Sequence, residues 1–155
     1  MKIHCLVLCI LGPLLSSCTD SSASSTAANP FMNVSYEVVA QGLQAGITNQ
    51  QLHVVTDDAE LAALAARAVF SPTIPALDLT AKNVVAIFTG LAGDCSGLAV
   101  VNVSKSADIL LVEIEKTFHS DRACVAVIPN NGPYILVTTP KTGKPVSFAF
   151  AVKIV

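Results

Sequence analysis

Hydrophobic and polar residues follow strand periodicity over most of the chain from residue 36 onward. The short β-prone runs YEVVAQG and QLHVV come first, separated by the turn-rich segment GLQAGITN. The later runs LAVVNV, ILLVEIEKTF, ACVAVIP and PYILVTTP are bounded by polar, proline or glycine residues. This pattern predicts about seven or eight strands, linked mainly by hairpins.

Two of the runs carry more specific information. NVVAIFTG is almost continuously apolar, so we expect a central strand that is buried on both faces. KPVSFAFAVKIV alternates strictly between large apolar and smaller or polar residues. Because side chains alternate between the faces of a strand, this pattern predicts that one set faces the core, namely Val146, Phe148, Phe150, Val152 and Ile154.

One segment, TDDAELAALAARAVF, interrupts the strand rhythm and predicts one main helix near residues 57–70. Asp57 with Glu60 three residues later is typical of a helix start. Ser71 precedes Pro72, which disfavours helical geometry and is expected to stop the helix. The residues at helical spacing on one face are Leu61, Leu64, Ala65 and Ala68. The fold class is therefore α+β, with a mostly antiparallel sheet that is curved or folded as a sandwich.

The N-terminus has the pattern of a bacterial lipoprotein signal peptide. Lys2 precedes a short apolar segment, and Leu15-Ser16-Ser17-Cys18 matches a lipobox, in which the cysteine receives a diacylglycerol (palmitate-type) anchor. The alternative is an ordinary secreted protein that is cleaved nearby, with Cys18 as a stray thiol. Lipidation at Cys18 predicts attachment to a membrane of the bacterial cell envelope, the outer membrane if the host has one.

Three domain ranges follow from these patterns. Residues 1–17 are predicted as signal peptide, residues 18–34 as a flexible tether rich in Ser, Ala and Thr, and residues 35–155 as one folded domain. No apolar run reaches the roughly 18 residues that a membrane-spanning helix needs, including the one at the N-terminus.

Composition argues against several classes of function. The net charge is −2 and no Lys/Arg cluster occurs, so we expect no nucleic-acid partner. The chain contains no GxGxxG or P-loop motif, so no cofactor is predicted. His53, His119 and the scattered acids do not form a convincing ligand set, so no metal is predicted either.

Five cysteines occur, and two of them, Cys95 and Cys124, lie inside the predicted domain. In an exported domain, an even pair is expected to form a disulfide. This bridge would close a loop of about 30 residues and stabilise the fold by roughly 3.5 kcal/mol. The alternative is a catalytic Cys95, which would need a histidine within hydrogen-bond reach and a lowered thiol pKa.

A serine nucleophile is the weaker interpretation. Asp94-Cys95-Ser96-Gly97 resembles the loop around a protease serine, but Cys95 separates the aspartate from the serine. His119-Ser120-Asp121 holds triad residue types as immediate neighbours, whereas triads are assembled from distant segments. We therefore expect a solvated turn at His119 and no catalytic residues.

Four segments, taken in order, resemble the C-terminal domain of PrcB-type bacterial lipoproteins, which belong to secreted protease complexes. They are DDAELAAL, LDLTAKNVVAIFTG, the glycine-rich turn into LAVVNV, and GPYILVTTPK. The family often has a Gly-Gly-Tyr type turn where this chain has Ser96-Gly97-Leu98. The resemblance implies a non-enzymatic subunit that stabilises or positions a protease.

The glycine-containing turns predict where a partner protein would bind, because glycine permits close backbone approach. The candidate binding residues are Gly90, Gly93, Gly97, Gly132 and Tyr134. Two alternatives stay open. One is a protease inhibitor that presents loops from a small β scaffold, and the other is an enzyme that uses Cys95 or His119.

Overall fold

The computed structural model describes residues 30–71, 73–92, 95–120, 123 and 132–155. These residues form eight strands and one helix. In chain order they are β1 (Met32–Asn33), β2 (Glu37–Gly42), β3 (Gln50–Val55), α1 (Asp58–Arg67), β4 (Lys82–Thr89), β5 (Ser96–Lys105), β6 (Leu110–Phe118), β7 (Tyr134–Pro140) and β8 (Val146–Ile154). The predicted strand ACVAVIP lies almost entirely outside the described residues.

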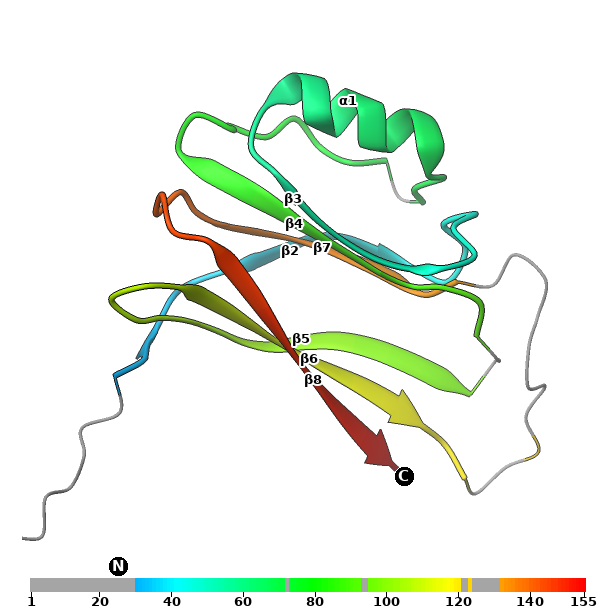
Figure 1. Ribbon diagram of the computed structural model, residues 1–155. Coiled ribbons are helices and arrows are strands. Elements are labelled where there is room, and N and C mark those ends of the chain that lie inside the picture. The colour runs from blue at the N-terminus through cyan, green and yellow to red at the C-terminus, as the bar shows by residue number, and fades with distance from the viewer. Residues whose placement is uncertain (1–29, 72, 93–94, 121–122, 124–131) are drawn as a thin grey trace, which may run out of the picture.

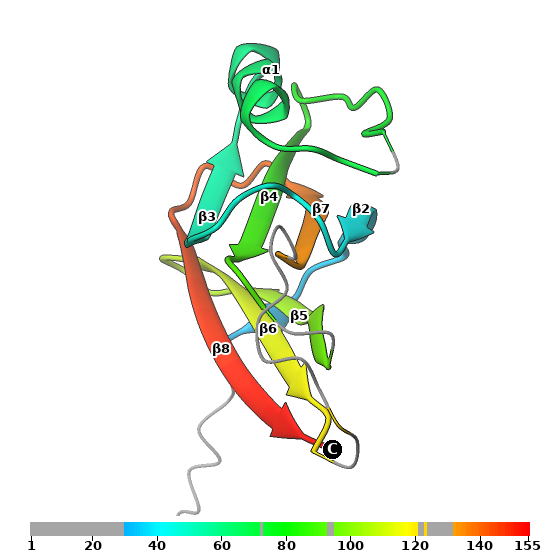
Figure 2. The same cartoon turned by 90° about the vertical axis from the view of Figure 1, so that its right-hand side faces the viewer.

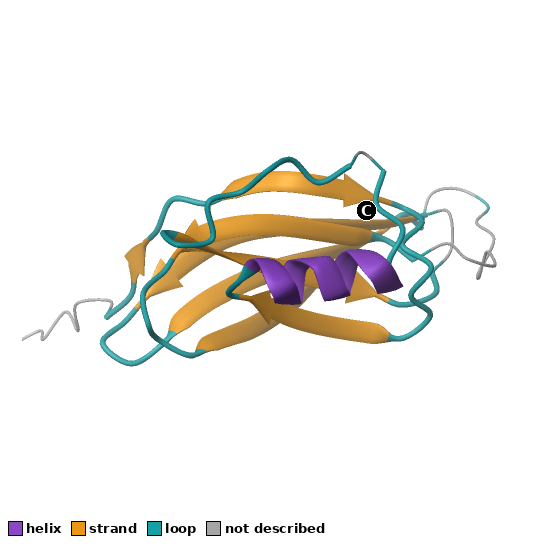
Figure 3. Cartoon of the chain, turned by 90° about the horizontal axis from the view of Figure 1, so that it is seen from above, coloured by secondary structure: helices purple, strands orange, loops and turns teal. Residues whose placement is uncertain are grey.

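The strands form two four-stranded sheets, of order β1-β5-β6-β8 and β2-β7-β4-β3. We call them the lower and the upper sheet, as they lie in Figure 1, where α1 covers the far side of the upper sheet. Figure 3 shows α1 lying over the strands of that sheet. The expectation of a mostly antiparallel α+β fold with one main helix is confirmed.

The strand connections differ from the expectation of hairpins. Among the described strands, β5 and β6 form an antiparallel pair joined directly by a short turn. β7 instead inserts between β2 and β4. The chain then passes to the lower sheet, where β8 pairs in parallel with β6. Hairpins were expected because consecutive strands usually pair, and here tertiary pairing overrides that tendency.

The strand β4 is central and buried on both faces, as its continuous apolar run predicts. β3 and β7 pair with it on either side. Val84, Ala86 and Phe88 belong to the core under α1. Val85 and Ile87 belong to the core between the two sheets. Alternation along one strand therefore supplies both cores.

The start of α1 is well defined. The Asp57 side chain accepts a hydrogen bond from the Glu60 backbone N–H at 2.8 Å, and Glu60 Oε2 accepts one from the Thr56 N–H at 2.7 Å. These two bonds satisfy donors that a helix start otherwise leaves open. Among the described residues, no helix is long and apolar enough to cross a membrane.

The helix ends earlier than the proline signal predicts. Its last residue is Arg67, and Ala68 is already extended and buried. The next residue, Val69, donates its backbone N–H to the Ala45 carbonyl at 2.9 Å, so the chain leaves the helix to bond with the segment after β2. Of the predicted buried face, Leu64 and Ala68 are buried and Leu61 is half-buried, but Ala65 is exposed.

The lower sheet begins within the range predicted as tether. Met32 and Asn33 pair with Lys105 and Ser104 of β5, and Val34 donates its N–H to the Val103 carbonyl at 2.8 Å. Residues 32–34 therefore belong to the folded domain rather than to a free linker.

The expectation that all large apolar residues of β8 face a core is wrong for half of the strand. Val146 and Phe148 do pack against the core between the sheets. Phe150, Val152 and Ile154 lie on the same face but are exposed. The two sheets diverge toward the ends of β6 and β8, and the upper sheet leaves these three side chains exposed (Figure 1).

Candidate functional site

Two of the predicted binding glycines, Gly90 and Gly132, are buried in a backbone junction. Gly90 has a φ of 76°, and a Cβ there would lie 2.9 Å from the Gln50 backbone nitrogen. A Cβ on Gly132 would lie 2.9 Å from the Ile47 carbonyl oxygen. These contacts give both glycines a packing role inside the domain, because only a residue without a side chain fits there.

Tyr134 is also an interior residue, with 2% of its surface exposed. Its hydroxyl donates to the Ser71 carbonyl at 3.0 Å and accepts from the Ser71 N–H at 2.8 Å. Its ring packs edge-on against Phe70 at a centroid distance of 5.3 Å. Tyr134 thus fastens the segment after α1 to the upper sheet and does not present a surface for a partner. The preceding Gly132-Pro133 predicts a turn at this position, and a turn gives no sign that the Tyr134 side chain is buried.

The remaining predicted residues divide between the surface and the part outside the structure. Gly97 lines a cleft of about 230 Å³ where the two sheets separate. Gly93 lies outside the described residues. The cleft combines residues from the ends of three strands and two connections, and those that matter below are Leu91, Ala92, Lys116 and Phe118.

An exposed apolar strip continues from this cleft along the lower sheet. It consists of Phe118 on β6 and Phe150, Val152 and Ile154 on β8, with exposed fractions of 43%, 38%, 63% and 73%. We call these four residues together with Leu91 the open-end surface. The register of β6 and β8 explains where the strip starts. Ile114 pairs with Phe150 and is itself buried, whereas Phe118, Val152 and Ile154, which lie nearer the ends of the two strands, are exposed.

Lys116 brings a positive charge to the open-end surface. Its Nζ donates to Gln50 Oε1 at 2.8 Å, which links the lower sheet to β3 of the upper sheet. The same Nζ lies 5.0 Å from the centroid of the Phe150 ring, a distance at which a cation is attracted to an aromatic face. The surface therefore offers a large apolar area with one cation at its inner margin.

Cys95 forms a disulfide in the structure. Cys124 lies outside the described residues, so the Cys95–Cys124 pairing stays a prediction. The cysteine is a cross-strand neighbour of His119, whose backbone N–H donates to the Cys95 carbonyl at 3.1 Å. The fold thus brings together the two residues of the enzyme alternative, but a sulfur held in a disulfide is not a thiolate nucleophile.

His53, the other domain histidine, has a structural environment on β3. Its Nε2 is 2.9 Å from Gln51 Oε1, and its ring lies edge-on to Phe88. Burial lowers the pKa of His53, and the positive charge of Arg67 lowers it further. Within the described ranges, no group of three or more His, Cys, Asp or Glu residues is placed to hold a metal ion.

The sequence pattern of the open-end surface is the alternation of large apolar residues in β8, and this pattern predicts a core-facing strand. The alternation in β8 correctly identifies the residues that share a face. It does not show how far the opposite sheet extends, and that decides which of them are covered.

The junction at Gly90 gives a stability prediction with a matched control. Gly90→Ala combines a positive φ with a steric clash against backbone, so we expect a loss of about 2 to 4 kcal/mol of unfolding free energy. Gly46 also has a positive φ, of 71°, but an added Cβ meets nothing within 4 Å. Gly46→Ala should therefore lose only about 1 kcal/mol. Urea denaturation measures both values, and equal losses would contradict the packing role.

The lowered pKa of His53 predicts a pH dependence of stability. The unfolded chain binds a proton near the ordinary pKa of 6.5, whereas the folded chain binds it only at lower pH. Unfolding therefore takes up a proton in this window, and the free energy of unfolding should fall as the pH drops below 6.5 until the folded pKa is passed. His53→Gln should flatten this slope. Arg67→Gln should reduce it only in part, because burial is the larger cause; an unchanged slope in His53→Gln would refute the assignment.

Comparison with known proteins adds no relative. The chain matches no family model, no curated protein and no solved structure.

Proposed function

We propose that this chain is an exported, lipid-anchored domain without catalysis of its own, which binds another exported protein through its open-end surface. The proposed partner is a secreted protease, which the domain stabilises or positions. The proposed scaffold is a curved β-sandwich, and the proposed anchor is Cys18 in the cell envelope.

The observation that carries the proposal is the uncovered apolar face at the open end. Phe118, Phe150, Val152 and Ile154 are contiguous positions on two paired strands, so their exposed side chains form one strip. Contiguous exposed apolar area is typical of protein-binding surfaces, whereas single exposed apolar residues are ordinary. Lys116 and Gln50 supply a polar margin, as the rim of a protein interface usually does.

The protease as partner is suggested by the resemblance of the segment order to PrcB-type C-terminal domains. The segments LDLTAKNVVAIFTG and GPYILVTTPK contain β4 and β7, which pair side by side in the upper sheet. The first segment ends at Thr89-Gly90, and the second begins at Gly132-Pro133. Both of these ends reach the cleft, because Thr89 and Pro133 line it. The resembling segments and the open-end surface are therefore parts of one region.

A protease inhibitor is the second candidate, favoured by one feature of the same region. The connection between β4 and β5 is fixed at Gly90 by its backbone junction and at Cys95 by a disulfide. Both residues are thus fixed points of the domain, as is useful for a scaffold that presents loops to an active-site cleft.

Replacement of open-end residues tests the binding proposal. We expect Leu91→Ser and Phe118→Ser, introduced into the full-length chain, to weaken capture of the partner by about 30-fold, the effect of losing a binding hot spot. Affinity capture from solubilised envelopes, followed by titration of the recovered protein, measures this loss.

Met32→Ser and Val38→Ser are the matched controls, because both residues are large, apolar and 61% and 44% exposed, and they pair with Lys105 and Val137, away from the cleft. They should leave capture unchanged. Equal loss in all four variants, or no stoichiometric partner for the wild-type chain, would reject the proposal. If the captured protein is a protease, its activity on addition of the domain separates the two candidates: retained activity and longer lifetime indicate stabilisation, and loss of activity indicates inhibition.

The anchor has its own test. Metabolic labelling with a palmitate analogue should mark the wild-type chain, and Cys18→Ser should abolish the label and release the protein from the membrane fraction. Cys5→Ser is a matched control that should keep the label, because Cys5 precedes the predicted cleavage site. Labelling that persists in Cys18→Ser would contradict lipidation at this residue.

A further inference from the structure

The strand β8 is a long free edge of the lower sheet. Its neighbour in the described part of the sheet is β6, and no other described strand lies on its outer side (Figure 2). β8 pairs with β6 over nine consecutive register positions without a bulge. A free edge of this kind presents a row of backbone donors and acceptors to any extended chain.

The hydrogen bonds at both ends of β8 show which residues point outward. Pro145 accepts from the Leu110 N–H at 3.0 Å, and Val155 donates to the Phe118 carbonyl at 2.9 Å and accepts from the Ser120 N–H at 2.8 Å. The odd-numbered residues of β8 thus turn their backbone groups toward β6. Alternate residues face the other way, so the even-numbered residues direct their N–H and C=O groups to the free edge.

The sequence of β8, VSFAFAVKI, is compatible with antiparallel pairing to itself. A two-fold axis at Phe150 opposes Phe148 to Val152 of a second copy and Val146 to Ile154, with Ala149 opposite Ala151. Large apolar residues meet large ones on one face, and on the other face Ala149 meets Ala151 and Ser147 meets Lys153. All outward-directed residues fall opposite one another in this register, so the pairing would form about ten backbone hydrogen bonds.

We propose that two copies of this chain associate by antiparallel pairing of their β8 edges, which joins the two lower sheets into one continuous sheet. The inference is independent of the proposed protease partner. In the joined sheet, the exposed strips of the two copies adjoin across the axis, so Phe150 and Val152 gain apolar neighbours that each copy alone does not provide.

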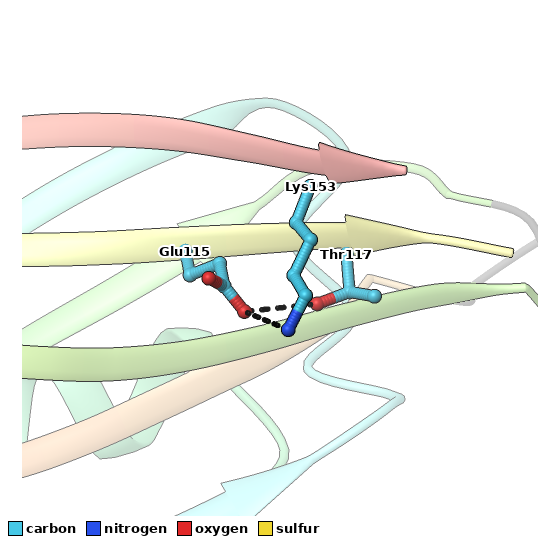
Figure 4. Close-up of polar contacts among 3 residues, drawn as sticks. All are labelled: Glu115, Thr117 and Lys153. Atoms are coloured by element: carbon cyan, nitrogen blue, oxygen red, sulfur yellow. Dashed lines mark hydrogen bonds and ion pairs between the residues drawn. The ribbon is translucent and has the colours of Figure 1, made fainter. Parts of the chain in front are cut away.

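Charge is compatible with a second copy as the occupant of this edge. Lys153 is the charged residue of β8, and within one copy its Nζ lies 4.0 Å from Glu115 Oε1 on the outer face (Figure 4). The proposed register opposes Lys153 to the neutral Ser147 of the second copy, behind which lies the apolar Leu111 of β6. Like charges therefore do not meet in this pairing.

The other sheet edges carry features that discourage pairing. β1 has two residues, and β2 has an irregular register between Val38 and Ala40. β3 presents the polar residues Gln50, Gln51 and His53 at its start. β8 has neither proline nor bulge and one charged residue. Natural edge strands usually carry such protection, so its absence at β8 is expected of an edge that is paired in the functional protein.

Cysteine cross-linking in the full-length chain tests the pairing and its register. Phe150 opposes itself across the axis at a Cα separation of about 5.5 Å, which a disulfide can span. Phe150→Cys should therefore give a covalent homodimer on oxidation with copper phenanthroline, detected by non-reducing electrophoresis and mass spectrometry. The wild-type chain sets the background from its own cysteines.

Val152→Cys is the matched control, because this position is more exposed than Phe150 but lies about 13 Å from its symmetry mate along the strands. We expect at least about tenfold less homodimer from Val152→Cys than from Phe150→Cys. Adding Val152→Pro to Phe150→Cys should lower the yield of homodimer about tenfold. Proline removes the Val152 N–H, which points to the free edge, and leaves the hydrogen bonds between β8 and β6 intact. Adding Val152→Thr keeps this N–H and should not lower the yield.

Three results would overturn the proposal. They are equal homodimer from Phe150→Cys and Val152→Cys, a yield that Val152→Pro leaves unchanged, and adducts of Phe150→Cys to a different protein in place of the homodimer. Retention of the Cys95 disulfide and of resistance to proteolysis shows that each variant is folded.

Discussion

The antiparallel pairing of β4 with β7 is the constraint on which the rest of the structure depends. It joins seven residue pairs, from Lys82 with Pro140 to Phe88 with Tyr134. Because both strands are central, their alternating side chains build two separate cores at once. One set packs under α1 and the other packs against the lower sheet. A single strand pair thus fixes the position of the helix, the position of the second sheet and the ends that flank the cleft.

Much of the local structure could be predicted from the sequence because its causes are local. The apolar run of β4 and the Asp57–Glu60 spacing at the start of α1 are examples, since burial on both faces and helix capping leave direct residue patterns. The end of α1 depended instead on a backbone bond from Val69 to Ala45. Similarly, no pattern within β8 could show that it joins β6 in parallel, because that partner lies in a different sheet from β7.

The candidate site was predicted less well than the fold, for a physical reason. Gly90, Gly132 and Tyr134 flank turns in sequence, and turns usually lie at the surface. Here three connections converge, so their glycines permit backbone packing and the tyrosine ring fills the interior. Conversely, Phe150, Val152 and Ile154 carry a core pattern but are exposed, because coverage is set by the angle between two sheets. Gly97 is the predicted residue that lies at the cleft.

The pairing of early strands with late ones has a consequence for how the chain acquires its structure. Glu37 pairs with Thr138, and Leu110 with Val146, so neither sheet has all its members until β7 and β8 have been synthesised. Contacts between residues so distant along the chain slow folding, because a large loop must close before they form. A nascent chain therefore keeps β4 and β6 uncovered along one side. This favours a mechanism in which the domain completes its structure only after the whole polypeptide has emerged.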